Sequence, residues 1–449
     1  MFCLVLLALS ALDSFSSGNS GAAGNGSNGG TELAATVNLV EVGKGYSKNS
    51  INTVVFRKNS LVTHNDTQYI AYYDGDGYVT LGKRTLGTKD WTIQKTRHTG
   101  NVLDAHNSIS IMADGAGYLH VAWDHHGHPL SYAKSDTPGS LILGDKEAMT
   151  GQSEGNVTYP EFYRLANGNL LFAYRDGTSG SGNLAINSYE TTTKIWTKVT
   201  SNLISGESQR NPYWQLYMDK AGTLHCSWVW RESSNVSTNN NLCYARSKNG
   251  GLSWERSDGT AYAIPITKAT AEIAWEIPQN SDLINQTSIY ADDAGNPYIA
   301  TYFTTEAIPQ YQLIWKAGAH WVLNQVSRRT EDFSLSGGGT LRIPIARPQL
   351  VVKQTGDKLS CYYIMRDEEY GSKVRIACLP DMTAPYWTYH DITDFSVDAW
   401  EPSYDTELWK NQGKLHIFVQ NTEQVSGEGM GTREPQTVYV LEVDFVDRF

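Results

Sequence analysis

Histidine, tyrosine and arginine residues that could act together on an acidic sugar lie between positions 106 and 213. They are His106, His125, His126, His128, Tyr159, Arg175, Arg210 and Tyr213. An arginine can pair bidentately with a carboxylate and so acidify the proton on the neighbouring carbon. A histidine or tyrosine can remove that proton, and the other can protonate the departing oxygen, although a tyrosine base needs a cationic neighbour to lower its pKa. This set favours β-elimination at a uronic acid.

Sequence patterns of several other enzyme classes are missing. The chain has no phosphate-binding glycine loop, dinucleotide fingerprint, nucleophile elbow or HExxH motif. A paired-carboxylate glycosidase needs two acids flanking the scissile bond. The acids nearest to the set are Asp124, Glu161 and Asp176. Asp124 and Asp176 both end a second strand, as Asp74 does, and this repetition favours a role in turns.

A repeated unit of short strands positions these residues. Each unit has a strand, a turn with Gly, Asn or Asp, a second strand ending in aromatic residues, and a third strand. The turn and second strand recur at 65–74, 114–124, 166–176, 219–230, 292–303, 354–367 and 411–420. Short antiparallel strands in seven such units predict an all-β, seven-bladed β-propeller. We expect the strand at 36–42 to complete the last blade and so close the ring.

One position of the repeat, the start of the innermost strand, is polar or ionisable in every copy. In chain order it is Lys58, His106, Tyr159, Asn211, Asn285, Arg347 and Glu401. Innermost strands of a propeller begin around the central channel at one face, and the loops joining second and third strands emerge there too. We therefore expect one concave site on this face, lined by His106, His126, Tyr159, Arg175 and Tyr213.

Composition excludes some classes of protein. The formal net charge is −11, which argues against a nucleic-acid partner. Charged residues make up only 18 % of the chain, and 40 residues are glycine, as in β-proteins with many turns. Beyond the apolar run at 2–12, which is too short to cross a bilayer, no long apolar segment occurs, so we expect no membrane span.

The N-terminal segment differs in composition from the rest of the chain. We expect residues 1–31 to be a signal peptide followed by a Ser/Gly/Asn linker, and 32–449 to be the propeller catalytic domain. The protein would then be secreted, to the extracellular space or the periplasm, and we expect a monomer. Four cysteines of the propeller are expected to be buried free thiols: Cys226, Cys243, Cys361 and Cys378.

Two segments carry a resemblance to a known family. The sevenfold repeat, with HNSISIMADGAGYLHVAWDHHGHPLSYAKS from His106 and YPEFYRLANGNLLFAYRDG from Tyr159, resembles the BNR-type propeller polysaccharide lyases, notably ulvan lyases. The resemblance implies that His106 and Tyr159 are the catalytic base and acid. It also implies that Arg175 neutralises a uronate carboxylate. His126 and Tyr213 would bind the uronate, with His125 and Tyr217 as second choices.

The expected function is cleavage of rhamnose–uronic acid linkages in an ulvan-like acidic polysaccharide, leaving a 4,5-unsaturated uronate. A basic cleft for such a polymer could draw on Lys58, Arg210, Arg231, Arg342 and Arg347. Related enzymes that act on L-rhamnosyl-α-1,4-glucuronate in arabinogalactan and gum arabic are an alternative. So are a sialidase or rhamnosidase and a non-catalytic glycan-binding propeller. The chemistry requires no cofactor. A structural calcium or zinc ion is possible in such propellers, but no ligand spacing in this sequence specifies one.

Overall fold

A computed structural model describes residues 35–445 except 57–58, 287, 385 and 428. The described residues belong to one compact unit, Leu33–Phe449. The expected signal peptide and linker at 1–31 lie outside the described residues, as does Lys58.

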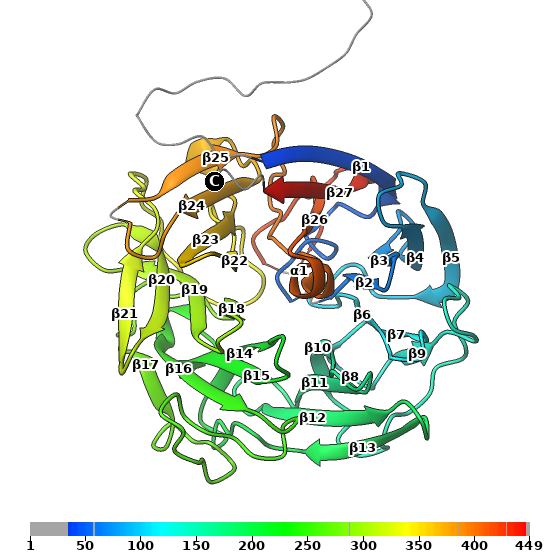
Figure 1. The fold of residues 1–449 in the computed structure, drawn as a ribbon, viewed down its shortest axis with the longest axis horizontal. Coiled ribbons are helices and arrows are strands. Elements are labelled where there is room, and N and C mark those ends of the chain that lie inside the picture. The colour runs from blue at the N-terminus through cyan, green and yellow to red at the C-terminus, as the bar shows by residue number, and fades with distance from the viewer. Residues whose placement is uncertain (1–34, 57–58, 287, 385, 428, 446–449) are drawn as a thin grey trace, which may run out of the picture. The chain divides into compact units, whose positions relative to one another are not determined.

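Seven antiparallel sheets follow one another in chain order around a central axis, so the fold is the predicted all-β seven-bladed β-propeller (Figure 1). Blade 1 consists of β2 (Leu61–His64), β3 (Thr67–Tyr73), β4 (Tyr78–Thr85) and β5 (Thr92–Thr99). Blade 2 consists of β6 (Ser110–Ala113), β7 (Leu119–Ala122) and β9 (Tyr132–Lys134). Blade 3 consists of β10 (Val157–Arg164), β11 (Leu170–Asp176), β12 (Asn183–Glu190) and β13 (Ile195–Thr200), with β8 (His126–His128) added beside β10.

The remaining blades continue the same order. Blade 4 consists of β14 (Asn211–Met218), β15 (Leu224–Arg231), β16 (Asn239–Ser247) and β17 (Glu272–Trp275). Blade 5 consists of β18 (Ser288–Ala291), β19 (Pro297–Thr304), β20 (Pro309–Ala317) and β21 (His320–Gln325). Blade 6 consists of β22 (Gln349–Thr355), β23 (Lys358–Met365), β24 (Arg375–Leu379) and β25 (Thr388–Asp391). Blade 7 consists of β26 (Leu415–Gln420), β27 (Gln436–Phe445) and β1 (Ala35–Gly45).

The last blade is built from both ends of the described chain. Strand β1 pairs antiparallel with β27, from Ala35 opposite Phe445 to Gly45 opposite Gln436. The predicted pairing of 36–42 with the last blade is therefore confirmed, and it gives β27 a partner on its outer side. The helix α1 (Thr406–Gln412) precedes β26 and lies near the centre of the ring in Figure 1. Within the described residues, no helix is long and apolar enough to span a membrane.

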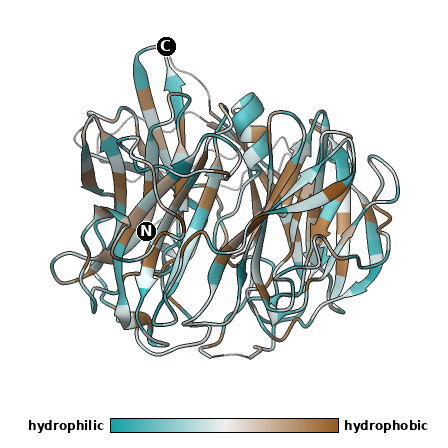
Figure 2. Cartoon of the chain, turned by 90° about the horizontal axis from the view of Figure 1, so that it is seen from below, coloured by the Kyte–Doolittle hydropathy of each residue, from teal (hydrophilic) through white to brown (hydrophobic). Residues whose placement is uncertain are grey.

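Large aromatic side chains at the ends of second strands fill the space between blades. Trp123, Trp228 and Trp230 are fully buried, because each blade presents its apolar faces to two neighbours. Figure 2 shows hydrophobic residues along the strands and hydrophilic residues in the loops. The four propeller cysteines are buried and unpaired, as expected.

Two buried histidines occupy equivalent places in blades 2 and 4. His120 is hydrogen-bonded to Tyr132 at 2.7 Å and to Asp114 at 3.3 Å. His225 is hydrogen-bonded to Tyr244 at 2.8 Å and to Asp219 at 3.1 Å. Because the same arrangement recurs with both rings fully buried, these histidines are part of the packing of the blade.

Candidate active site

A cavity of about 320 Å³ lies at the face where the innermost strands begin. The predicted site residues that line it are His106, His126, Tyr159, Arg175 and Tyr213. Asn285 and Arg347, from the same position of the repeat, also line it. The other lining residues are Phe56, Ser179, Arg231, Ser234, Val236, Ile284, Gly338, Gly339, Thr340, Leu341 and Ile343. Side chains more than 100 positions apart in the sequence thus meet around one hollow because every blade contributes its inner end.

Asp104 lies behind two of the cavity's histidines and holds both rings. Its Oδ1 atom accepts a hydrogen bond from Nδ1 of His106 at 2.7 Å, and Oδ2 accepts one from Nδ1 of His126 at 2.5 Å. The two imidazoles are stacked with their centroids 4.0 Å apart. Burial alone would raise the pKa of Asp104, but the hydrogen bonds from His106 and His126 outweigh it and hold the pKa well below its ordinary value.

The ionised Asp104 determines where each neutral imidazole carries its proton. A carboxylate can only accept hydrogen bonds, so Nδ1 must be the protonated nitrogen of both His106 and His126. The lone pair of each neutral ring is then on Nε2. This is the state in which a histidine can act as a general base, and the carboxylate stabilises the imidazolium that results.

Among the described residues, Asp104, His106 and His126 are also a group that could hold a metal ion. One ligand atom from each lies within 4.8 Å of the others. Their closest contacts, 2.7 and 2.5 Å between Nδ1 and carboxylate oxygen, have hydrogen-bond lengths. Two ligands on one tetrahedral zinc ion, each about 2.0–2.2 Å from the metal, stand roughly 3.4 Å apart. At these lengths Asp104, His106 and His126 form a hydrogen-bonded triad, and an ion held between these atoms would require the contacts to lengthen.

Tyr159 is aimed into the cavity by an irregular stretch of β10. Its backbone has a φ of 57°, and the register with β11 shifts between Thr158 and Glu161. A bulge of this kind redirects a side chain, and a tyrosine in the left-handed region costs energy that is usually met at functional positions. The ring packs 4.8 Å from Phe56, and the Arg175 guanidinium lies 4.9 Å over it.

A tyrosine base needs cationic neighbours to lower its pKa, and in the structure that effect falls on Tyr213 and not on Tyr159. Burial raises the pKa of Tyr159 well above its ordinary value, despite the opposing effect of Arg175. Burial would also raise the pKa of Tyr213, but Arg231 and Arg175 outweigh it and lower that pKa below its ordinary value. Tyr159 is thus protonated at neutral pH, which suits a proton donor.

Three arginines line the cavity, and they differ in how their charge is balanced. Arg347 forms a bidentate ion pair with Glu401, with Nε–Oε1 at 2.8 Å and Nη2–Oε2 at 2.7 Å. Arg175 is 2 % exposed and donates to the Thr158 hydroxyl at 3.1 Å, while its Nε has no partner among the described residues.

Arg231 resembles Arg175 in that its hydrogen-bond partners are uncharged. It donates to the backbone carbonyls of Ser233 at 3.2 Å and Ser234, and its guanidinium lies 5.6 Å over the Tyr213 ring. In the described part of the chain, no carboxylate forms an ion pair with Arg175 or Arg231. Two buried guanidiniums without counter-charges could therefore balance the charge of an anionic ligand in this cavity.

Two expected substrate-binding residues do not reach the cavity. His125 is fully buried, and its Nε2 accepts a hydrogen bond from the backbone of Ser131 at 2.8 Å, so it holds the loop in place. Burial lowers the pKa of His125 to about 3. Arg210 forms ion pairs with Glu207 at 2.8 Å and Glu232 at 2.9 Å. The structure therefore does not support the expected substrate-binding roles of His125 and Arg210.

The acids considered from the sequence are also absent from the cavity lining. Asp124 accepts a hydrogen bond from the backbone of Asn101 at 2.7 Å and has a φ of 68°, as expected for a turn residue. Glu161 accepts a hydrogen bond from the Tyr163 hydroxyl. None of the described residues that line the cavity is acidic.

A larger cavity of about 600 Å³ opens at the other ends of the innermost strands, where β14, β18 and β22 finish. Tyr217, the second choice for the uronate-binding tyrosine, lines this cavity instead. Its described lining includes lysines and aspartates but neither histidine nor arginine. The smaller cavity is therefore the better candidate active site, because it holds the groups that can move protons and bind a carboxylate.

Several residues of the site were not identified from the sequence, or were given too small a role. Asp104 was not singled out, although its place two residues before His106 is a usable signal for an orienting carboxylate. Arg231 was considered only as part of a broad basic cleft. Phe56 and the segment 338–343 reach the cavity from loops outside the repeated unit, so aligning the copies could not reveal them.

Comparisons with known proteins agree with this architecture. A family model described as a BNR repeat-containing family member matches residues 67–329. The solved structure of polysaccharide lyase Uly1 superposes with a TM-score of 0.65 at 14 % identity, covering 88 % of this chain and 91 % of that one. A PL25 ulvan lyase gives 0.62 at 13 % identity, covering 88 % and 96 %.

A third solved structure, a PL25 ulvan lyase bound to -[GlcA(1-4)Rha3S]-, gives a TM-score of 0.62 at 12 % identity with coverage of 88 % and 96 %. At these identities the likeness establishes the fold. No curated protein matches the sequence.

Proposed function

The chain belongs to the BNR repeat-containing family, and from this premise we propose that it is a polysaccharide lyase acting on rhamnose–uronic acid linkages of an ulvan-like polymer. The reaction is β-elimination, and it leaves a 4,5-unsaturated uronate at the new non-reducing end. The structural likeness to an ulvan lyase that holds a glucuronate–rhamnose oligosaccharide supports this substrate class. The expected secretion of the protein agrees with a polymer found outside the cell.

One observation carries the proposal: the cavity offers guanidiniums without counter-charges and proton-transfer groups, and none of its described lining residues is acidic. Hydrolysis by the usual route would need a pair of carboxylic acids flanking the bond. Elimination needs a cation for the carboxylate, a base for the C5 proton and an acid for the leaving oxygen. Arg175, His106 and Tyr159 meet these three needs.

In the proposed mechanism, Arg175 binds the uronate carboxylate and stabilises the negative charge that develops when C5 loses its proton. His106 removes that proton through Nε2, because Asp104 keeps the other ring nitrogen protonated. The electron pair of the C5–H bond forms the C4–C5 double bond, and the C4–O4 bond breaks. Tyr159 gives its proton to O4, and the raised pKa of its hydroxyl keeps that proton available at neutral pH.

His126 and Tyr213 contact the substrate beside these groups. The His126 ring stacks on His106 and extends the surface that faces the uronate. Arg231 and Arg175 outweigh burial and lower the pKa of Tyr213, so its hydroxyl is a strong hydrogen-bond donor to the bound carboxylate. Neither role requires a cofactor.

The test is incubation of the purified protein with ulvan and, separately, with gum arabic, while following the ultraviolet absorbance of the unsaturated uronate. The proposal predicts an increase with ulvan that the Tyr159→Phe variant does not give. An increase with gum arabic alone would assign the enzyme to the L-rhamnosyl-glucuronate group. Binding of either polymer without any new absorbance would indicate a glycan-binding propeller instead.

A further inference from the structure

Four of the residues that line the cavity are aliphatic: Val236, Ile284, Leu341 and Ile343. They share one hydrophobic cluster: Val236 and Ile284 are buried members, and Leu341 and Ile343 pack against it. Val236 and Ile284 are almost fully buried, at 4 % and 2 % exposure, whereas Leu341 and Ile343 are only partly buried. We call these four residues the aliphatic wall. Such a surface is covered favourably only by apolar groups of a ligand.

The orientation of Leu341 and Ile343 follows from the local chain. Both line the cavity, while Arg342 between them is exposed and pairs with Glu368 at 3.3 Å. Side chains alternate in this way along an extended backbone. The charged residue is thus directed to solvent, and the two aliphatic residues face the ligand.

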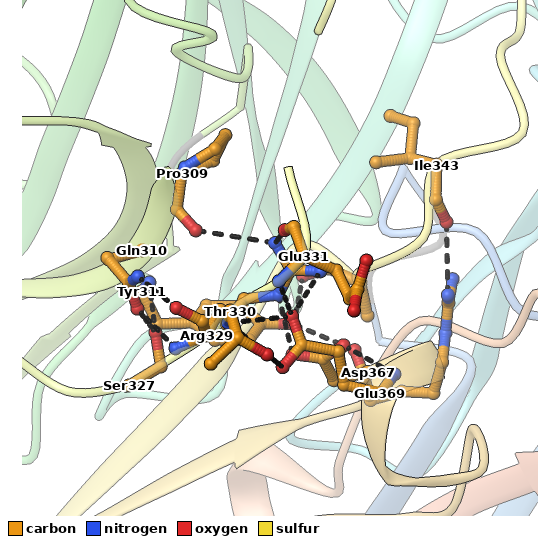
Figure 3. A network of polar contacts seen from close by, with 12 residues as sticks. Pro309, Gln310, Tyr311, Ser327, Arg329, Thr330, Glu331, Ile343, Asp367 and Glu369 are labelled. Carbon is orange, nitrogen blue, oxygen red and sulfur yellow. Dashed lines mark hydrogen bonds and ion pairs between the residues drawn. The ribbon is translucent and has the colours of Figure 1, made fainter. Parts of the chain in front are cut away.

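The segment 326–348, which carries Leu341 and Ile343, is anchored at its start. The guanidinium of Arg329 is buried and forms ion pairs with Asp367 at 2.8 Å and Glu369 at 3.2 Å (Figure 3). Ser327 is joined to Gln310 by a hydrogen bond of 2.7 Å. These contacts fix the segment to blades 5 and 6.

The cavity-lining part of the segment is anchored separately. Arg366 donates to the backbone carbonyl of Ile343 at 3.0 Å, also visible in Figure 3. The backbone N–H of Gly337 donates to the Asn235 side chain at 2.8 Å, and that of Val236 donates to the Gly337 carbonyl at 2.8 Å. The aliphatic wall is therefore preorganised, which a specificity site requires.

We propose that the aliphatic wall is a subsite for the methyl group of a 6-deoxyhexose next to the uronate, and that Leu341 and Ile343 determine this specificity. The inference rests on the proposed function, because the uronate carboxylate at Arg175 places the neighbouring sugar in the same cavity. A methyl group gains free energy when it is buried against Leu341 and Ile343. A hydroxymethyl group would bury its hydroxyl where aliphatic side chains offer no hydrogen bond.

Two disaccharides test this directly: α-L-rhamnosyl-(1→4)-glucuronate and its α-L-mannosyl counterpart, which differ only in the hydroxyl on C6. Their dissociation constants are measured by calorimetry on the Tyr159→Phe protein, in which turnover is blocked. We expect tighter binding of the rhamnosyl compound by about 10- to 100-fold, the discrimination that an apolar pocket gives against an added hydroxyl. Introducing Leu341→Asn or Ile343→Thr should reduce the ratio to within about threefold.

Arg342→Gln is the matched control, because its side chain lies in the same segment and faces away from the cavity. It should leave the ratio unchanged, and thermal unfolding of every variant verifies that it is folded. Equal binding of both disaccharides by the Tyr159→Phe protein, or an unchanged ratio in both wall variants, would overturn the subsite. A preserved ratio in a wild-type protein that forms no unsaturated product would instead refute the lyase function and leave the subsite standing.

Discussion

Replacing Asp104 by asparagine should disable the base without disturbing the cavity lining. The carboxylate accepts hydrogen bonds from Nδ1 of His106 and of His126, at 2.7 and 2.5 Å. An amide of the same size has only one oxygen, so it can accept from one ring but must present its NH₂ group to the other. The atom facing His106 also accepts the backbone N–H of His106 at 2.9 Å, so the amide oxygen stays there and the NH₂ group faces His126. His106 then keeps its proton on Nδ1 but loses the negative charge that stabilises its imidazolium.

The size of the effect follows from the role assigned to His106. Loss of a general base typically slows a reaction about 10²–10⁴-fold, or about 3–5 kcal/mol of activation free energy. The same exchange of Asp for Asn behind the catalytic histidine of a serine protease costs about 10⁴-fold, but there the ring changes tautomer, so that figure is an upper bound for Asp104→Asn. We expect Asp104→Asn to lower kcat by at least about 10²-fold with a small change in KM, since Asp104 is not among the residues that line the cavity.

The assay follows the ultraviolet absorbance of the unsaturated uronate over a range of ulvan concentrations. Asp124→Asn is the matched control, because Asp124 is a turn residue outside the cavity lining and asparagine tolerates its left-handed backbone. Circular dichroism and thermal unfolding verify that both variants are folded. An Asp104→Asn enzyme with wild-type kcat would refute the assignment of His106 as a base oriented by Asp104.

Three further predictions concern other residues in and around the site. Tyr159→Phe should lower kcat about 10²–10⁴-fold on ulvan with KM nearly unchanged, because it removes the proton given to O4; a near-wild-type initial rate would exclude Tyr159 as the acid. Arg175→Lys should reduce kcat/KM at least about 10-fold, since an ammonium cannot pair bidentately with the carboxylate, whereas Arg210→Lys should retain most activity; equal losses would contradict the cavity assignment. His125→Gln should keep kcat but change the pH dependence of stability. The low pKa of His125, about 3, means that its neutral form contributes stability above about pH 6.5 that is lost as pH falls toward 3, so unfolding titrations should show a flatter acid slope in this variant, and an unchanged slope would argue against a buried neutral ring.

The propeller and much of the site could be predicted from the sequence because both follow from the repeat. Aligned copies reveal the strand starts, and the geometry of a propeller brings those starts to one face, which is why His106 and Tyr159 share a cavity. The same alignment cannot say which of two neighbouring side chains points inward. His125 and His126 are adjacent in one loop, yet the first is fully buried and the second lines the cavity.

Other features depend on contacts that the repeat does not encode. Arg347 and Arg175 are both ionisable residues at the channel face, but among the described residues only Arg347 has a carboxylate partner, Glu401, from the next blade. The balance between burial and neighbouring charge decides which tyrosine has the lowered pKa, and it favours Tyr213 over Tyr159. The segment 338–343 belongs to one inter-blade connection alone, so its part in the cavity could only come from the structure.

The most direct test of the proposed lyase is the mass of its products in ¹⁸O-labelled water. Elimination adds no water, so the new non-reducing ends from ulvan should be lighter than hydrolytic products by one water molecule. The freed reducing ends should carry no ¹⁸O beyond that of an enzyme-free control for slow exchange. Incorporation of ¹⁸O at the cleaved bond, with saturated uronate ends, would make the enzyme a glycosidase and contradict the roles given to Arg175, His106 and Tyr159.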